Sequence, residues 1–233
     1  MRIIIDGPMT GRENMAKDEA LLATGEPVLR FYQWRPPCVS IGYFQDPDRD
    51  IDLDYLKTAG IDLVRRPTGG RAVLHEDELT YALVLPATLL PSGVVQSYQL
   101  VAGIFVAALG ELGLVCDIKG PDGRPDRNAG CFSSTSAYEI CCRGKKVMGS
   151  AQVRRNGVVL QHGSLLLSVD YERQARCLKR RAAVTTTLLE ERMAGIRTYL
   201  GEKASPASLI PLLLKHATRV LPDLRPDGRT AQT

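Results

Sequence analysis

Residues 65–75 read RRPTGGRAVLH and place two arginines, a proline, two glycines and a third arginine close together. Gly69 and Gly70 have no Cβ atom, so a substrate chain can lie directly against the backbone there. Pro67 fixes its own φ and partly offsets the flexibility of the glycines. The arginines add positive charge and forked hydrogen-bond donors beside this gap. We interpret the stretch as one wall of an acyl-binding site, with a basic β-turn between two strands as the alternative.

The composition is that of an ordinary globular protein. The chain has 233 residues, of which 44% are hydrophobic and 24% charged, and it is long enough to bury a full core. No repeat and no long linker is visible, so we expect residues 1–233 to form a single domain. The net charge of +4 suits an acidic partner or substrate. This net charge is too small to indicate a nucleic-acid-binding protein, and only 6% of the residues are aromatic.

The opening segment, MRIIIDGPMTGRENMA, has too short an apolar run for a signal peptide. The chain also shows no run of about 18 apolar residues, so we expect no membrane span. A reducing cytoplasm, with the six cysteines as free thiols, is therefore the expected location. Because there is no CxxC pair and there are only three histidines, we do not expect a structural zinc site.

The periodicity of apolar residues and the turn signals predict a mixture of strands and helices. Strands are expected at residues 2–5, 28–34, 38–42, 61–65, 79–85, 115–118, 137–142, 145–148, 150–154 and 158–167. Helices are expected at 14–23 with an Asn14 cap, at 52–60 with an Asp52 cap, over 92–113, from 171 with an Asp170 cap, and at 208–216 with a Ser208 cap. Residues 73–74 and 79–85 flank a polar turn and predict a hairpin, and Asn156-Gly157 predicts another. The pattern indicates an α/β or α+β fold with a mixed, largely antiparallel β-sheet and packed helices, not a doubly wound one.

A second cluster of candidate functional residues runs from 129 to 167. Cys131 follows Gly130 at the end of a polar loop, where a thiol can be exposed. A thiol with a pKa of about 8.5 is only about 3% thiolate at pH 7, and a nearby ammonium group that lowered the pKa by about two units would make it roughly three-quarters thiolate. Cys131 and a lysine of the Lys145-Lys146 pair are thus a candidate nucleophile and activator, and strand alternation allows only one of the lysines to face the site. The alternative is that Cys131 is an ordinary small core residue.

The remaining candidates are less specific. Gly149, Ser150 and Ala151 form a run of small residues, as the wall of a narrow channel requires. His75 and His162 can each act as a base, although such single histidines are more often structural. Among the other cysteines, Cys38 and Cys116 are expected in the core, one of the adjacent Cys141 and Cys142 in the core and the other at the surface, and Cys177 has no assigned role.

Several of these stretches resemble the lipoate–protein ligase and octanoyltransferase family. They are RRPTGGRAVLH with ELTYALVLP, GKKVMGSAQ with LQHGSLLL, and, nearer the N-terminus, DGPMTGRENMAKDEALL and PPCVSIGYFQD. The resemblance covers roughly residues 1–170 and is weak in the C-terminal part. It implies the fold shared with biotin protein ligases and the core of class II synthetases, in which a mixed β-sheet carries packed helices.

The segment Gly130-Cys131-Phe132 is similar to that of the lipoate-ligase-like octanoyltransferases, in which a cysteine takes up the acyl group. The resemblance therefore implies that Cys131 is the nucleophile and that Lys146, rather than Lys145, lowers the pKa of the thiol and polarises the carbonyl. It also implies an octanoyl pocket lined by Arg65, Arg66, Thr68, Gly69, Gly70, Arg71, Ala72, His75, Gly149, Ser150, Ala151, His162 and Gly163. Two departures from the family pattern are Ala82, where a serine is expected, and Met148, which could narrow the pocket.

The reaction that the resemblance implies is a two-step acyl transfer. The donor would be octanoyl-acyl carrier protein, and the acceptor the lysine of a lipoyl domain or of the glycine-cleavage H protein. Neither ATP nor a metal is expected as a cofactor, because the thioester already carries the activation, and neither nucleic acid nor a membrane is expected as a partner. The alternatives are an ATP-dependent lipoate–protein ligase, an octanoyl amidotransferase acting between lipoyl domains, and a non-enzymatic protein that only binds carrier domains.

Overall fold

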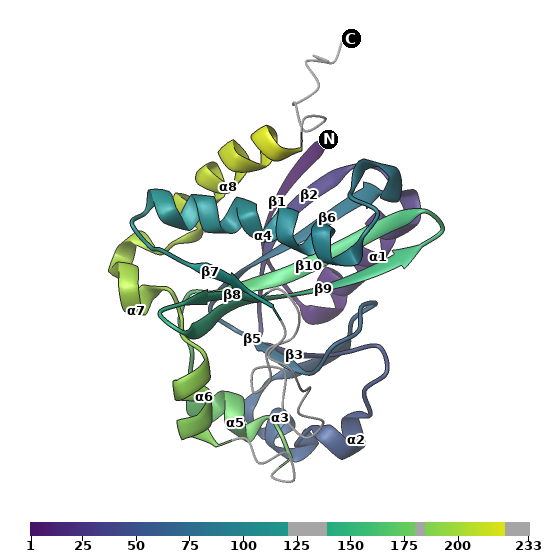
Figure 1. The fold of residues 1–233 in the computed structure, drawn as a ribbon. Coiled ribbons are helices and arrows are strands. Elements are labelled where there is room, and N and C mark those ends of the chain that lie inside the picture. The colour runs from purple at the N-terminus through teal and green to yellow at the C-terminus, as the bar shows by residue number, and fades with distance from the viewer. Residues whose placement is uncertain (121–138, 180–184, 222–233) are drawn as a thin grey trace.

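The computed structural model describes residues 1–120, 139–179 and 185–221 as two β-sheets with helices packed around them (Figure 1). One sheet has seven strands in the order β1-β2-β6-β10-β9-β8-β7, and the other has three in the order β4-β3-β5. The strands are β1 Arg2–Met9, β2 Val28–Trp34, β3 Cys38–Ile41, β4 Asp62–Arg65, β5 Val73–His75, β6 Glu78–Pro86, β7 Asp117–Lys119, β8 Glu139–Cys142, β9 Lys145–Arg155 and β10 Val158–Leu166. The helices are α1 Gly11–Thr24, α2 Pro47–Asp50, α3 Leu53–Ala59, α4 Val94–Glu111, α5 Tyr171–Arg176, α6 Thr186–Arg192, α7 Arg197–Leu200 and α8 Pro206–Val220, with short 3₁₀ turns at Ala87–Leu89 and Gly201–Lys203.

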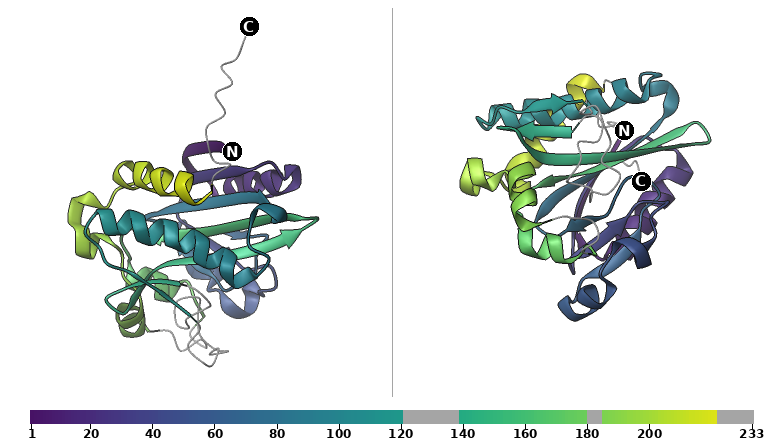
Figure 2. Two further views of the ribbon diagram at one scale, coloured as in Figure 1. Left: turned by 45° about the horizontal axis from the view of Figure 1, so that its top comes forward. Right: turned by 60° about the horizontal axis from the view of Figure 1, so that its bottom comes forward.

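The predicted mixed, largely antiparallel architecture is confirmed. Two pairs of neighbouring strands, β1 with β2 and β3 with β4, are parallel, and the other six described pairs are antiparallel. Figures 1 and 2 show α4 and α8 along one face of the seven-stranded sheet and the β4-β3-β5 sheet on its other side. The functional candidates of β9 and β10 therefore have two different environments, one on each face of their sheet.

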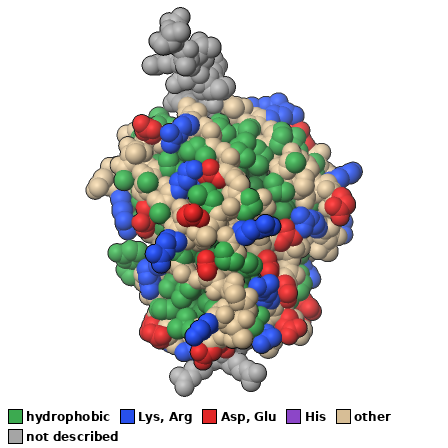
Figure 3. Space-filling model, turned by 180° about the vertical axis from the view of Figure 1, so that it is seen from behind, with side chains coloured by type: hydrophobic (Ala, Val, Ile, Leu, Met, Phe, Trp, Pro, Cys, Tyr) green, Lys and Arg blue, Asp and Glu red, His purple; other side chains and the backbone are tan. Residues whose placement is uncertain are grey.

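The largest apolar core lies between the seven-stranded sheet and the α4–α8 layer. α4 contributes Val101, Ile104, Phe105 and Leu109 at helical spacing, and these side chains are buried against strands and against α8. By length and composition α4 could span a membrane, but such a segment is equally typical of a core helix, which is how α4 packs. Figure 3 shows the molecule from behind the view of Figure 1. On this face, charged side chains of both signs are interspersed with apolar areas.

The N-terminal elements differ from the sequence prediction in two ways. β1 continues through Pro8 to Met9, because it is an edge strand where a register shift accommodates a residue without an N–H group. α1 begins after Thr10 rather than Asn14, since Thr10 and Glu13 form a reciprocal capping box. Asn14 is buried instead, and its Nδ2 donates to the carbonyl oxygen of Gln33 at 3.0 Å.

The predicted hairpin at residues 73–85 is wrong. β5 pairs with β3 in the small sheet, whereas β6 pairs with β2 and β10 in the large one, so the turn between β5 and β6 carries the chain from one sheet to the other. Two predicted strands at 145–148 and 150–154 form the single strand β9. α8 is capped by Ser205 rather than Ser208, so that Pro211 lies inside the helix.

Arg30 of β2 joins the first three elements of the chain through a fully buried guanidinium group. Its Nη1 donates to Asp18 Oδ1 of α1 at 2.7 Å, and its Nε donates to Asp6 Oδ2 of β1 at 2.7 Å. Nη2 donates to Asn14 Oδ1 at 2.7 Å, and the guanidinium carbon lies 3.9 Å from the centroid of the Tyr32 ring. Each buried charge in this cluster therefore has a partner, as burial away from water requires.

We predict that Arg30→Met lowers the free energy of unfolding by about 3–5 kcal/mol, because it leaves Asp18 buried without its cation. The measurement is urea denaturation followed by circular dichroism. Arg49→Met is the matched control, since the Arg49 side chain is 69% exposed beside Asp50 and a surface pair of this kind contributes little to stability. Equal losses of stability in the two variants would contradict the role given to Arg30.

Candidate functional site

The predicted residues of β9 and β10 divide between the two faces of the seven-stranded sheet. Gly149 pairs with Ser164 and Ala151 pairs with His162, so these four residues face the small sheet and α1. Ser150 and Gly163 form the intervening pair and face α4. There the Ser150 Oγ lies 3.0 Å from the hydroxyl oxygen of Tyr81, whose ring packs on Phe105. The structure thus brings Gly149, Ala151 and His162 together and places Ser150 and Gly163 behind them.

A β-bulge in β9 places Lys146 on the same face as Gly149. Against β8, Ile140 pairs with Met148 and Cys141 with Lys146, so Val147 is an extra residue on β9. Val147 and Met148 consequently both pack in the core beneath α4, and Met148 does not face the side of the sheet that carries Lys146. Lys146 and Gly149 share a face although they are three positions apart in a strand.

The absence of a side chain at Gly149 makes room for the Lys146 ammonium group. A Cβ atom built on Gly149 would lie 3.0 Å from both Cε and Nζ of Lys146. Lys145 instead donates from its Nζ to the carbonyl oxygen of Glu190 at the surface. The geometry therefore places Lys146, and not Lys145, at the small-residue wall.

Sequence reasoning missed Glu139 of β8. Its Oε1 accepts a hydrogen bond from the Lys146 Nζ, and the side chains of both residues are almost completely buried. The available signal was a carboxylate within the otherwise apolar stretch Tyr138-Glu139-Ile140-Cys141-Cys142. A charged residue in such a stretch is rarely buried without a partner.

The diglycine loop is held in place by its own arginines. Arg65 Nη1 donates to the carbonyl oxygens of Gly42, Tyr43 and Gln45 at 2.9, 2.7 and 2.9 Å. Arg66 donates to the carbonyl oxygens of Ser40, Gly69 and Arg71, at 2.9, 3.0 and 2.7 Å. These guanidinium donors, predicted to face a substrate, are thus directed at the backbone of the loop and of the neighbouring turn.

The two glycines of this loop have different surroundings. A Cβ atom on Gly69 would meet nothing within 4 Å, so the backbone is open there as predicted. Gly70 has a φ of +92° and lies against Arg66 Nη2, so a side chain at this position would be strained. Gly42 packs against the carbonyl oxygen of Gly70, and Ala72 is buried among the apolar residues of the small sheet.

His162 connects the diglycine loop to the large sheet. Its Nε2 lies 2.7 Å from the Thr68 Oγ1, and its Nδ1 lies 3.1 Å from Asp18 Oδ2. Burial lowers the pKa of the His162 imidazole below its usual range, although the hydrogen bond with Asp18 opposes the shift. His162 is therefore a neutral link between the loop, β10 and α1.

His75 forms a similar buried link between the two sheets. Its Nε2 lies 2.7 Å from the Ser40 Oγ, its Nδ1 lies 2.7 Å from Glu78 Oε1, and its ring stacks on Trp34 at 4.0 Å. Ser164 of β10 also donates to Glu78 Oε1, at 2.6 Å. A serine, a histidine and a carboxylate in this order suggest a hydrolase triad. However, Ser40 is 1% exposed and donors of Arg66 reach its Oγ, so a substrate has no access to it.

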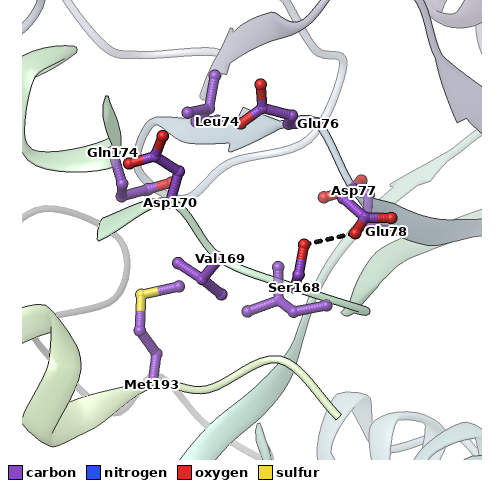
Figure 4. A pocket seen from close by; sticks show the side chains of 10 residues that line it. Leu74, Glu76, Asp77, Glu78, Ser168, Val169, Asp170, Gln174 and Met193 are labelled. Atoms are coloured by element: carbon purple, nitrogen blue, oxygen red, sulfur yellow. Dashed lines mark hydrogen bonds between the residues drawn. The ribbon is translucent and has the colours of Figure 1, made fainter. Parts of the chain in front are cut away.

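A small hollow lies where the chain leaves β10 for α5 (Figure 4). It is lined by Leu74, Glu76, Asp77, Glu78, Leu166, Ser168, Val169, Asp170, Gln174 and Met193. Met193 forms an isolated parallel bridge with Lys146, so the hollow adjoins the lysine strand. Two of its carboxylates, Glu76 and Asp77, form ion pairs with Arg173 and Arg197, so the hollow is less acidic than its composition suggests.

The predicted nucleophile, Cys131, lies outside the residues that the structure describes. Cys38 and Cys116 are buried, as predicted. Burial raises the pKa of Cys116 to about 12 and that of Cys177 to about 12, which makes both thiols poor nucleophiles. Across residues 1–120, 139–179 and 185–221, no group of three His, Cys, Asp or Glu side chains could hold a metal ion.

The expectation that one of Cys141 and Cys142 lies at the surface is wrong. Cys142 is in the core beneath α4, and Cys141 is 4% exposed on the other face of β8, opposite Lys146. Alternation places the two thiols on opposite faces as expected, but both faces of this strand are covered.

A family model described as the lipoyl protein ligase A/B catalytic domain matches residues 10–218. The chain belongs to this family. It is 42% identical over 212 residues to the octanoyltransferase LipM of Symbiobacterium thermophilum, a match covering 86% of this chain and 77% of the relative. It is 40% identical over 233 residues to the LipM of Moorella thermoacetica, covering 94% and 85%. These relatives indicate that this protein is an enzyme of the acyltransferase class.

Solved structures of the same family share the fold. A lipoate-protein ligase A bound with ATP has a TM-score of 0.80 at 29% identity, over 99% of this chain and 89% of its own. A bipartite lipoate protein ligase from Thermoplasma acidophilum has a TM-score of 0.79 at 27% identity, over 99% and 87%. A biotin protein ligase from Aquifex aeolicus, at 11% identity, a TM-score of 0.51 and coverage of 95% and 69%, shares the fold alone.

The lowered pKa of His162 predicts how stability depends on pH. The unfolded chain, with a histidine pKa of about 6.5, binds the proton more readily than the folded chain, so this contribution to stability is complete above pH 6.5 and is lost as the pH falls below it. We expect wild type to lose up to about 1.4 kcal/mol per pH unit more than His162→Gln between pH 6.5 and 5. Urea denaturation of both proteins across this range gives their free energies of unfolding at each pH. Subtracting one from the other removes the contribution of the other titrating groups, which both proteins share. Parallel pH profiles would contradict the prediction.

Proposed function

We propose that this protein transfers an octanoyl group from octanoyl-acyl carrier protein, through a thioester on Cys131, to the lysine of a lipoyl domain or of the glycine-cleavage H protein. The observation that carries the proposal is the buried Lys146 ammonium beside Gly149. It occurs in a chain whose relatives at 40–42% identity are octanoyltransferases. We further propose that the enzyme acts in the cytoplasm as a single catalytic domain.

In the first step the Cys131 thiolate attacks the carbonyl carbon of the donor thioester. The bond to the carrier sulfur breaks, the carrier thiolate takes up a proton, and the octanoyl group remains on Cys131. In the second step the unprotonated acceptor amine attacks this thioester and Cys131 leaves as a thiolate. One of the two amine protons is released to solvent, and the other remains on the amide nitrogen. Lys146 favours the thiolate and the negative charge that develops on the carbonyl oxygen in both steps.

This route needs neither ATP nor a metal ion, because a thioester is already an activated acyl group. An ATP-dependent lipoate–protein ligase remains the second candidate, since a family structure that matches 99% of this chain is bound with ATP. The two candidates differ in the covalent state of the enzyme. Only the transferase forms an octanoyl-enzyme without ATP.

Intact-mass spectrometry after incubation with octanoyl-acyl carrier protein, without ATP, tests this. We expect wild type to gain one octanoyl unit and Cys131→Ala to gain none, while both retain the same far-ultraviolet circular dichroism spectrum. Cys177→Ala serves as a control because Cys177 is buried under the small sheet and should leave acylation of the enzyme unchanged. Modification of the acceptor by Cys131→Ala at the wild-type rate would refute the nucleophile. Modification by wild type only with ATP and free octanoate would indicate the ligase.

We predict that Gly149→Ala slows acylation of the enzyme by roughly 10-fold or more, because its methyl group would displace the ammonium of Lys146 from the wall. Gly110→Ala is the control: its Cβ meets nothing within 4 Å on α4, so it should fold and react as wild type does. Single-turnover kinetics with octanoyl-acyl carrier protein provide the rates. A wild-type rate in Gly149→Ala would show that the position of this ammonium group is not critical.

A further inference from the structure

We infer that Glu139 is a positioning residue for the transfer: it pairs with the ammonium group of Lys146 and holds it against the small-residue wall at Gly149. The structural part of this inference stands on the contacts of β8 and β9 alone. Its consequence for the rate rests on the function proposed above.

The burial of Lys146 makes a partner necessary. Its side chain is 5% exposed and that of Glu139 is 3% exposed. Burial of an ammonium group is costly unless an anion compensates for the lost hydration, and the carboxylate of Glu139 is in place to do so. The charge matters because a neutral amine would neither stabilise a thiolate nor attract electron density from a carbonyl group.

The arrangement of the strands places the two charges of the ion pair at different distances from the small-residue wall. Glu139 belongs to β8, which lies on the side of β9 away from β10. The Lys146 side chain extends along β9 until its Nζ reaches Gly149, which pairs with Ser164 of β10. The positive end of the pair thus lies at the small-residue wall and the negative end lies behind it, so the wall experiences a net positive potential although the pair is neutral overall.

The β-bulge at Val147 makes this contact possible. In a regular strand Lys146 would alternate onto the α4 face, away from Gly149 and from the carboxylate. With the extra residue, Lys146, Glu139 and Cys141 all lie on the face that carries Gly149. Glu139 and Cys141 are accordingly the titratable groups that β8 presents to the lysine, whereas Met193 and Ala194, which contact its backbone, bear no charge.

A buried ion pair can also be purely structural, and the two roles predict different results. If Glu139 only stabilised the fold, Glu139→Gln would lower the unfolding midpoint without altering the chemistry of the folded fraction. If it positions a charged Lys146, folded Glu139→Gln has a lower kcat for enzyme acylation at nearly unchanged KM for octanoyl-acyl carrier protein, because the ammonium group is no longer held beside Gly149. Glu139→Asp, which keeps the charge, should recover much of the lost rate.

The experiment combines both readouts on the full chain. Crystal structures locate the Lys146 Nζ, and single-turnover kinetics follow acylation of Cys131. We expect the Nζ to lie against Glu139 and Gly149 in wild type and to move away from Gly149 in Glu139→Gln. We also expect Glu139→Gln to reduce kcat at least 10-fold. Lys145→Gln is the matched control, since Lys145 contacts the surface carbonyl of Glu190, and it should behave as wild type.

Three outcomes would overturn the inference: a Lys146 Nζ that lies away from Glu139 or Gly149 in wild type, an unchanged Nζ position in Glu139→Gln, or a wild-type kcat in that variant. The wild-type structure decides the structural part even if Glu139→Gln fails to fold. Failure of the proposed function looks different. In that case wild type gains no octanoyl unit, while the Nζ positions in wild type and Glu139→Gln still differ and show that Glu139 holds the lysine.

Discussion

One chain of buried polar contacts fixes the diglycine loop to the large sheet. It runs from Thr68 through His162 to Asp18 and ends at Arg30, so it joins the loop to β10, α1 and β2. Each group in it is buried, and a buried polar group without a partner would cost about 1–3 kcal/mol, so breaking any link disturbs the others. The position of the diglycine loop relative to β10 therefore depends on this whole chain of buried contacts.

Several residues that the sequence offers as ligand-binding or catalytic candidates have structural contacts instead. By residue type Arg65 and Arg66 are candidates for binding an anionic ligand, yet they donate to backbone carbonyl oxygens and give a glycine-containing loop a defined shape. His75 and His162 look like candidate bases, yet each is linked through both ring nitrogens to a hydroxyl and a carboxylate. Within this loop, Gly69 is a position at which an added side chain would meet nothing within 4 Å.

Local signals made much of the fold predictable. The apolar stripe of α4, the alternation of β2 and the Asn156-Gly157 turn, with φ angles of +50° and +76°, are properties of short segments and were read correctly. The cap of α1 was also local, because Thr10 and Glu13 have capping-box spacing, but Asn14 is an equally good cap by residue type. The false hairpin between β5 and β6 has a different cause. A turn signal shows that the chain reverses but not that the two strands belong to the same sheet.

The site itself was only partly predictable, for a reason that also explains its chemistry. Alternation along β9 leaves Lys145 and Lys146 equivalent, and only the unpaired Val147 decides between them. That bulge depends on pairing with β8, and Glu139 reaches Lys146 across the same pair of strands, so neither is encoded in the segment that bears the lysine. A cation exposed to water would need no such arrangement, but it would also be screened and would shift a neighbouring pKa little. The burial that makes the ammonium group effective therefore requires a partner from another strand. A pattern within one segment of the sequence cannot identify that partner.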